Sequence, residues 1–279
     1  MVTICFFNIW KFEKKSYLYC LIDRYMKKRL ISILILSLLV QFSVQAKKSH
    51  KVSKGHKKHK THITHITQPT VTLNEVDLKD SVWGIDVSHH QSAINWEKLG
   101  EQKPNFMFIK ASEGVTCQDE RYCENYNEAK KLGILVGSYH FFSYKTSGKD
   151  QATNFLSVAQ HKSGDLFPVL DAEFRKKMPK KDFVTKELTD FINAVYESLG
   201  YYPIIYCNYN FYKLYLKEHL PTHCKLWIVD YKQKPECEWT FWQSTDRLKI
   251  AGISGFVDLN KFNGSTLNLK SFILKDLAF

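Results

Sequence analysis

Carboxylic acids stand at the end of an apolar run in residues 168–173 (PVLDAE), a run typical of a buried strand. Alternate residues of a strand face the same side, so Asp171 and Glu173 should point together, with Cα atoms about 6–7 Å apart. Two carboxyl groups this close in a partly dry pocket push their pKa values apart, which leaves one protonated and the other ionised. Cleavage of a glycosidic bond requires such a pair.

Other apolar runs also end in side chains that could line the same pocket: Asp86, Tyr139, Tyr206, Trp227, Asp230, Gln243 and Asp258. An ionised side chain inside an apolar strand is costly unless it is paired or used. Pairing with Lys110 or helix capping would explain one such motif, but not acids at several strand ends beside Trp and Tyr, which commonly stack on sugars. His89 and His140 are expected to be pocket walls or hydrogen-bonded scaffolding.

No group of His, Asp or Glu has the spacing of metal ligands, and no cysteine lies in a CxxC motif. We therefore expect neither a metal nor a cofactor. In an exported protein, the closely spaced cysteines predict disulfides between Cys117 and Cys123 and between Cys224 and Cys237. Cys207 would then remain as a buried strand residue.

The elements that must position these residues follow from the apolar pattern. Strands are predicted at residues 83–88, 106–112, 135–142, 167–173, 203–207, 225–229, 240–244 and 256–260. Helical periodicity covers residues 188–199, and a second helix over 121–132 should end at Gly133. Strand–helix alternation predicts a parallel sheet with helices outside it.

The last third of the chain breaks this rhythm, because only a short segment containing Pro235 separates Val229 from Thr240. A helical crossover usually needs more residues, so hairpins or plain loops should join the last strands. The fold class is therefore α/β, an irregular (β/α) barrel with helices mainly in its first part. Function in barrels gathers at the carboxyl ends of the strands, where the acids stand.

A resemblance to a known family rests on eight runs that occur in order between residues 83 and 274. They are WGIDVSHHQ (83–91), INW (94–96), FIKASEG (108–114), GSYHFF (137–142), LDAE (170–173), LWIVDY (226–231), WQ (242–243) and GFVDLN (255–260). Together they resemble the family-25 glycoside hydrolases, the Chalaropsis-type lysozymes. The resemblance implies an irregular barrel and a muramidase that hydrolyses the β-1,4 bond between N-acetylmuramic acid and N-acetylglucosamine in peptidoglycan.

Roles carried over by position follow from this resemblance. Glu173 would be the general acid/base, Asp171 would assist on the opposite side of the reacting sugar, and Asp86 would be the acid of the first strand. Asp258 and Asp230 would be supporting carboxylates, while other residues would line the sugar groove: Tyr139, Tyr206, Trp227 and Gln243. The anomeric configuration would be retained, by direct attack of Asp171 or by attack of the substrate's own acetamido group.

Two alternatives to this activity stay open at this point. One is a peptidoglycan-binding module without catalysis. The other is a hydrolase of another aminosugar polymer, such as chitin.

The net charge of +12 suggests a nucleic-acid partner until it is divided along the 279 residues. Residues 1–46 carry +5 (seven basic, two acidic), residues 47–70 carry +7, and residues 71–279 are neutral with 26 charges of each sign. A basic stripe on a folded face is therefore not expected, and neither is nucleic-acid binding. With no interface pattern in the sequence, a monomer is expected.

The N-terminal charge fits an export signal and a tether. Residues 1–46 form a leader in which translation is expected to start at Met26, with a basic start, an apolar core and a cut after Ala46. The alternative is a retained membrane anchor. Residues 47–82 are expected to form a disordered Lys/His-rich linker, of which 47–70 could contact an anionic envelope, and 83–279 the catalytic domain. The protein should be secreted, or be periplasmic or in the cell envelope.

Overall fold

The computed structural model describes residues 69–76, 78 and 81–276, all within one compact unit. The leader and the tail up to residue 68 lie outside the described residues, so their start, cleavage and envelope contact stay predictions. In the part of the chain that is described, no helix has the length and apolar character needed to cross a membrane.

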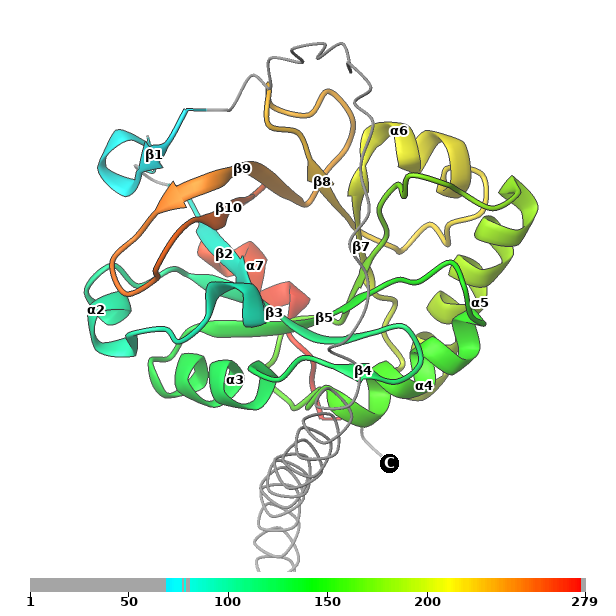
Figure 1. Ribbon diagram of the computed structural model, residues 1–279, viewed down its shortest axis with the longest axis horizontal. Helices are drawn as coiled ribbons and strands as arrows, with labels where there is room; N and C mark the ends of the chain where they lie inside the picture. The colour runs from blue at the N-terminus through cyan, green and yellow to red at the C-terminus, as the bar shows by residue number, and fades with distance from the viewer. Residues whose placement is uncertain (1–68, 77, 79–80, 277–279) are drawn as a thin grey trace, which may run out of the picture. The chain divides into compact units, whose positions relative to one another are not determined.

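Eight strands close into a barrel (Figure 1). They are β2 (Trp83–Val87), β3 (Phe106–Glu113), β5 (Leu135–Phe141), β6 (Val169–Asp171), β7 (Ile204–Asn208), β8 (Leu226–Val229), β9 (Phe241–Lys249) and β10 (Val257–Phe262). Neighbours are parallel from β2 round to β9. β10 is antiparallel to both β9 and β2 and closes the barrel. The predicted irregular barrel is confirmed.

Helices cover the outside of the first part of the barrel (Figure 1). Between the early strands lie α2 (Trp96–Glu101), α3 (Tyr122–Lys131), α4 (Gly148–Val158) and α5 (Lys181–Leu199). α3 ends as predicted, because Gly133 adopts a left-handed φ of 69° that suits glycine. Short turns complete the helical set: η1 (Leu73–Glu75), η2 (His89–Gln91), α6 (Tyr209–Phe211), η3 (Tyr212–Leu216), α7 (Thr266–Leu269) and η4 (Lys270–Phe272).

The last connections are of two kinds. A hairpin joins β9 to antiparallel β10, as predicted. β8 and β9 are parallel, and the segment between them contains no helix, so this is the plain-loop case. The loop returns to the start of β9 alongside β8, where the Thr240 amide donates to the Leu226 carbonyl at 2.8 Å.

Two apolar cores follow from the alternation of side chains along the strands. On β3, Phe106 and Phe108 point into the barrel, whereas Met107 and Ile109 pack against the helices. Burying one such ring stabilises the fold by about 2–3 kcal/mol. Gly137 makes room for Phe108, because a methyl group at this position would lie 2.6 Å from the ring.

The interior is closed at the amino ends of the strands by α7 and η4. Leu269 belongs to the same inner cluster as Phe106, and Phe272 packs against it. The Phe272 carbonyl accepts from the Phe167 amide at 2.8 Å, just before β6 begins. Apolar side chains therefore fill the lower barrel, and polar ones occupy the layer at the carboxyl ends.

The folded domain begins earlier than expected. Val71–Thr72 form β1, which is parallel to β9, and Leu73 and Val76 pack against the outer core. The expectation of a disordered linker through residue 82 is therefore wrong for this segment. Its few apolar residues gave too weak a pattern to reveal a strand whose partner lies far along the chain.

The two predicted disulfides are not formed. Cys117, Cys224 and Cys237 are free thiols, while Cys207 is buried on β7 as expected. Cys117 lies on the short strand β4 (Cys117–Gln118), which is antiparallel to β3, whereas Cys123 lies in the first turn of α3. Although Cys117 and Cys123 are close in sequence, they lie on separate elements.

Candidate active site

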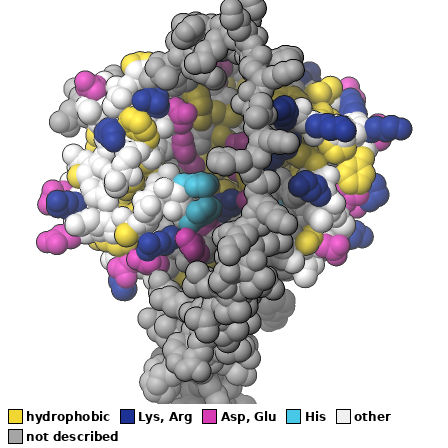
Figure 2. Space-filling model, viewed as in Figure 1, with side chains coloured by type: hydrophobic (Ala, Val, Ile, Leu, Met, Phe, Trp, Pro, Cys, Tyr) yellow, Lys and Arg dark blue, Asp and Glu magenta, His cyan; other side chains and the backbone are white. Residues whose placement is uncertain are grey.

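A cavity of about 390 Å³ opens at the carboxyl ends of the strands. Figure 2 shows acidic side chains and histidines gathered around a hollow in this face. Of the predicted site residues, the barrel brings eight together as lining of this cavity: Asp86, Tyr139, Asp171, Glu173, Tyr206, Trp227, Gln243 and Asp258. Seven of them lie on seven different strands at positions where alternation turns the side chain inward, and Glu173 follows β6 two residues after Asp171.

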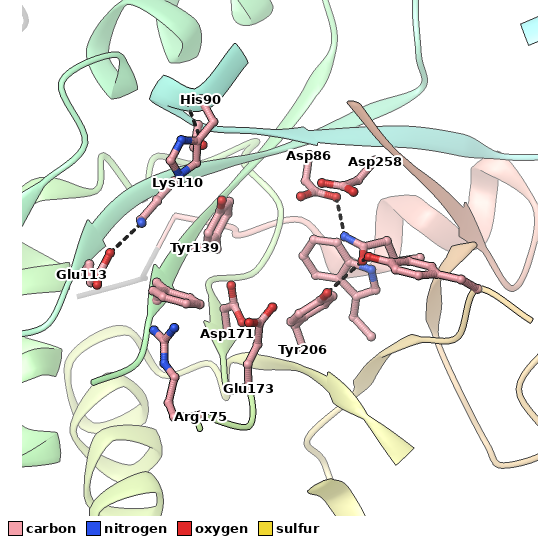
Figure 3. Close-up of a pocket in the computed structure, with 15 residues that line it drawn as sticks. Asp86, His90, Lys110, Glu113, Tyr139, Asp171, Glu173, Arg175, Tyr206 and Asp258 are labelled. Atoms are coloured by element: carbon pink, nitrogen blue, oxygen red, sulfur yellow. Dashed lines mark hydrogen bonds and ion pairs between the residues drawn. The ribbon is translucent and has the colours of Figure 1, made fainter. Parts of the chain in front are cut away.

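Asp171 and Glu173 lie next to each other at the end of β6 and point into the cavity (Figure 3). Asp171 is buried, and its Oδ1 atom has no hydrogen-bond partner among the described residues. Glu173 is half-buried and follows the strand. Its backbone carbonyl accepts from the Tyr144 hydroxyl at 2.9 Å, which holds the loop in place.

Both acids favour the protonated form more than they would in water. Burial raises the pKa of Asp171 well above its ordinary value, and the nearby charges of Glu173 and Asp86 raise it further. Burial also raises the pKa of Glu173, although Arg175 opposes that rise. A carboxylic acid that keeps its proton near neutral pH can act as a general acid.

A second pair of acids, Asp86 and Asp258, lies across the cavity on β2 and β10 (Figure 3). Burial and the charge of Asp86 raise the pKa of Asp258 to about 10. Asp258 therefore keeps its proton and donates a hydrogen bond to Asp86. Burial also raises the pKa of Asp86, but Asn260 and Gln243 donate to its Oδ2 atom at 2.7 and 3.0 Å and favour its ionised form.

Gln243 joins this pair to the aromatic wall. Its Oε1 atom accepts from the hydroxyls of Tyr206 and Tyr231, each at 2.8 Å. The Trp227 indole donates to Asn260 at 2.8 Å and packs on Phe108 with ring centroids 4.6 Å apart. The polar layer is thus held directly above the apolar core of the barrel.

Comparison with known proteins decides the family. The sequence model of the family "Glycosyl hydrolases family 25" matches residues 85–253. This chain belongs to glycosyl hydrolase family 25. It is 35% identical over 202 residues to the uncharacterized protein YegX of Escherichia coli K12, covering 69% of this chain and 74% of that protein.

Two further similarities support the assignment. Lysozyme M1 of Streptomyces globisporus is 32% identical over 209 residues, which cover 67% of this chain and 70% of that protein. A solved family 25 glycosyl hydrolase from Bacillus anthracis has a TM-score of 0.65 and 31% identity, and the match covers 79% of this chain and 99% of that one. The protein is therefore a glycoside hydrolase, which disfavours the alternative of a purely binding module.

Asp230 is the predicted site residue that does not line the cavity of this family 25 hydrolase. Its Oδ1 atom accepts from the amides of Lys232 and Gln233 at 2.9 and 3.3 Å, so it stabilises the turn after β8. The neighbouring Tyr231 lines the cavity instead. A supporting role for Asp230 stays a prediction.

Sequence reasoning assigned no role in the site to several other lining residues of the hydrolase: Ser88, His90, Lys110, Glu113, Phe141, Arg175 and Tyr231. Lys110 pairs with Glu113 at 2.8 Å rather than with the catalytic candidates. The β3–β5 register is irregular between Lys110 and Ser112, which lets both Lys110 and Glu113 reach the cavity. Strict alternation along β3 would place these two side chains on opposite faces. Phe141 could have been found, because it is two residues after Tyr139 on β5.

The two histidines singled out from the sequence, His89 and His140, have structural partners. His140 is buried between the Ser112 hydroxyl at 2.8 Å and Gln151 at 3.2 Å, and burial lowers its pKa to about 4. His89 lies 2.7 Å from Asp119. The scaffolding expectation is confirmed for both residues. No cluster of three or more potential metal ligands occurs in the described part of the chain.

Proposed function

We propose that this hydrolase is an exported muramidase that cleaves the β-1,4 bond between N-acetylmuramic acid and N-acetylglucosamine in peptidoglycan. The observation that carries the proposal is the pair formed by buried Asp171 and half-buried Glu173 at the end of β6, inside the cavity of a family 25 barrel. The similarity to lysozyme M1 supports the choice of substrate.

Glu173 is the general acid/base of the proposed reaction. Its raised pKa lets it carry the proton that the leaving sugar oxygen needs. Once that proton has been transferred, the Glu173 carboxylate can accept a proton from the incoming water. Because Glu173 is half-buried, it remains accessible to both the sugar and the water.

Asp171, which stands with Glu173 at the end of β6, assists the proposed reaction. Asp171 lines the cavity, so its carboxylate is placed to accept the N–H of a 2-acetamido group and orient that group for attack. The alternative is direct attack by the carboxylate on the anomeric carbon. Both routes invert the anomeric centre twice and retain the β configuration.

Asp86 and Asp258 complete the proposed machinery. Asp86 lies close enough for its charge to raise the pKa of both catalytic acids, so that charge would also act on positive charge that develops at the reacting sugar. Asp258 donates to Asp86 and holds it in place. The rings of Tyr139, Tyr206 and Trp227 supply walls for the sugar.

The proposed location rests on the leader and tail. The basic start and apolar core within residues 1–46 support export, and the seven lysines of residues 47–70 support contact with an anionic envelope. Deletion of residues 47–70 should reduce wall binding at low salt and leave activity on soluble glycan unchanged. Unchanged salt-sensitive binding would refute the contact.

The activity is tested by digesting peptidoglycan and chitin with the purified protein and identifying the reducing-end sugar by mass spectrometry. We expect reducing-end muramic acid from peptidoglycan and little release from chitin. Glu173→Gln should lower the rate about 10²- to 10⁴-fold, because a carboxamide cannot donate the proton. The exposed Glu197→Gln is the matched control. Preferential release from chitin, or full activity of Glu173→Gln, would overturn the assignment.

A further inference from the structure

Arg175 stands at the rim of the active-site cavity, two residues after Glu173 (Figure 3). Its guanidinium carbon lies 4.2 Å from the centroid of the Phe141 ring, which also lines the cavity. The second cation of the cavity, Lys110, lies 4.8 Å from the same centroid. The two cations therefore meet one aromatic ring at one side of the cavity.

The two cations differ in their partners. Lys110 is neutralised by Glu113 at 2.8 Å. Arg175 takes part in none of the ion pairs found among the described residues, and its backbone amide alone donates, to the sulfur of Met178 at 3.3 Å. The side chain is exposed, so its charge is available to a ligand that enters the cavity.

The aromatic contact prepares the guanidinium for binding. A guanidinium against a ring face is held by the cation–π attraction while its N–H groups stay available. Their fork matches the two oxygens of a carboxylate. Phe141 thus reduces the rotational freedom that a carboxylate ligand would otherwise have to remove.

Arg175 has an electrostatic cost for the reaction. Its charge lowers the pKa of Glu173 and of Asp171, which works against keeping a proton on the general acid. Besides Arg175 and Lys110, the cavity is lined by five carboxyl side chains: Asp86, Glu113, Asp171, Glu173 and Asp258. An unpaired cation among them is accounted for if it binds an anionic part of the substrate.

We propose that Arg175 binds a carboxylate carried on the 3-O-lactyl arm of the muramic sugar and thereby selects muramic-acid glycans over neutral aminosugar polymers. This inference rests on the proposed muramidase function. The carboxylate has two sources, the lactyl group of strands without peptide and the stem peptide attached to that group. Chitin carries neither.

The test compares three soluble glycan preparations: strands with free lactyl carboxylates, the same strands with those groups converted to methylamides, and strands with intact stem peptides. Arg175→Gln should raise KM about tenfold on carboxylate-bearing strands, since hydrogen bonds to charged groups at an exposed rim contribute at the low end of their range. On methylamide strands the change should stay below about twofold, within the ordinary effect of a surface substitution.

Two further variants separate binding from structure. Arg175→Lys keeps the charge but not the fork, and should restore part of the lost affinity. Lys176→Gln removes one charge from the adjacent exposed residue, which does not line the cavity, and should leave KM unchanged on all three glycans. Thermal unfolding of each variant checks that the fold is intact.

The outcomes are distinct. A loss confined to free-lactyl strands or to peptide-bearing strands supports the proposal and names the source of the carboxylate. Equal loss on all three glycans overturns it and leaves Arg175 as a modulator of the acid pair. Calorimetry with the Glu173→Gln and Glu173→Gln/Arg175→Gln proteins tests binding without turnover, so the inference can fail or hold even if the wild-type protein cleaves none of the strands. Equal affinities of the two proteins for carboxylate-bearing strands would also overturn it.

Discussion

Asp258 stands directly opposite Asp86 on antiparallel strands, and the half-buried Asp258 carboxyl group donates a hydrogen bond to the buried Asp86. Two like charges that face each other on such strands would normally repel. Here Asp258 keeps a proton because burial and the charge of Asp86 raise its pKa, while Asn260 and Gln243 satisfy Asp86. The proton on Asp258 therefore prevents the pair from carrying two negative charges inside the barrel.

The shared proton makes stability depend on pH. The folded pKa of Asp258 is about 10 against an ordinary 3.8. The stability that this raised pKa contributes to the fold is therefore complete at low pH and is lost as pH rises towards 10. Asp258→Asn cannot ionise and should lose less stability between about pH 5 and about pH 9, by at least 1–2 kcal/mol. Urea unfolding measures this loss. The exposed Glu218→Gln should follow the wild type, and an equal loss in Asp258→Asn would contradict the shared proton.

Removing the charge of Asp171 should trade activity for stability. Its buried Oδ1 atom lacks a partner among the described residues, and burial raises its pKa, so ionisation at neutral pH costs free energy. Asp171→Asn should stabilise the fold by about 1 kcal/mol, more at high pH than at low pH, and lower turnover about 10²-fold or more. Thermal unfolding and reducing-end release measure the two effects.

Asp165 provides the contrast to Asp171, because it is a buried acid with its partners in place. It accepts from Tyr126 and Lys130 at 2.7 Å each and from the Lys162 amide at 3.0 Å. Asp165→Asn should destabilise the fold by about 2–4 kcal/mol and leave turnover per folded molecule unchanged. Equal stability changes in the two variants would show that the missing partner of Asp171 has no energetic consequence.

The pH dependence of turnover should report Glu173. A general acid must be protonated, so activity falls as pH rises through its pKa, which burial places above the ordinary 4.5. Since Arg175 opposes that rise, Arg175→Gln should move the alkaline limb of kcat to higher pH. Rates on methylamide strands across the pH range measure the limb without the proposed carboxylate contact. A limb that stays in place or moves to lower pH would contradict this coupling.

Gln243 should matter more for stability than an average buried amide. Its side chain makes hydrogen bonds with Tyr206, Tyr231 and Asp86 at the same time. Gln243→Leu therefore leaves two hydroxyls and one carboxylate each without one hydrogen-bond partner. We expect a loss of about 3–5 kcal/mol in urea unfolding, together with lower activity. The exposed Gln233→Leu is the matched control and should change stability by less than about 0.5 kcal/mol.

Much of the fold could be predicted because its signals are local. The apolar runs located the eight barrel strands to within a few residues, and Gly133 marked the end of α3. Alternation along β6 placed Asp171 on the inner face and brought Glu173 to the same cavity. β1 was missed, because its pairing with β9 depends on residues far away in the sequence.

The site was predicted where it lies on strands and was missed where it lies beyond them. Tyr231 rather than Asp230 enters the cavity, since a turn begins at that point and uses the Asp230 carboxylate. Arg175 follows β6 in a loop, whose direction no periodicity reports. The disulfide expectation failed for a related reason, because nearness in sequence does not place two cysteines on facing elements.

Where the strands are regular, the sequence by itself determined which side chains face the barrel interior, because a strand alternates its faces with a period of two. Tertiary structure decided the charge state of those side chains and their partners. Barrel closure places Gln243 and Asn260 against Asp86, removes water from Asp171 and leaves Arg175 at the rim with no ion-pair partner among the described residues. Desolvation and hydrogen bonding depend on neighbours in space, and these neighbours exist only after β10 has closed the barrel against β2.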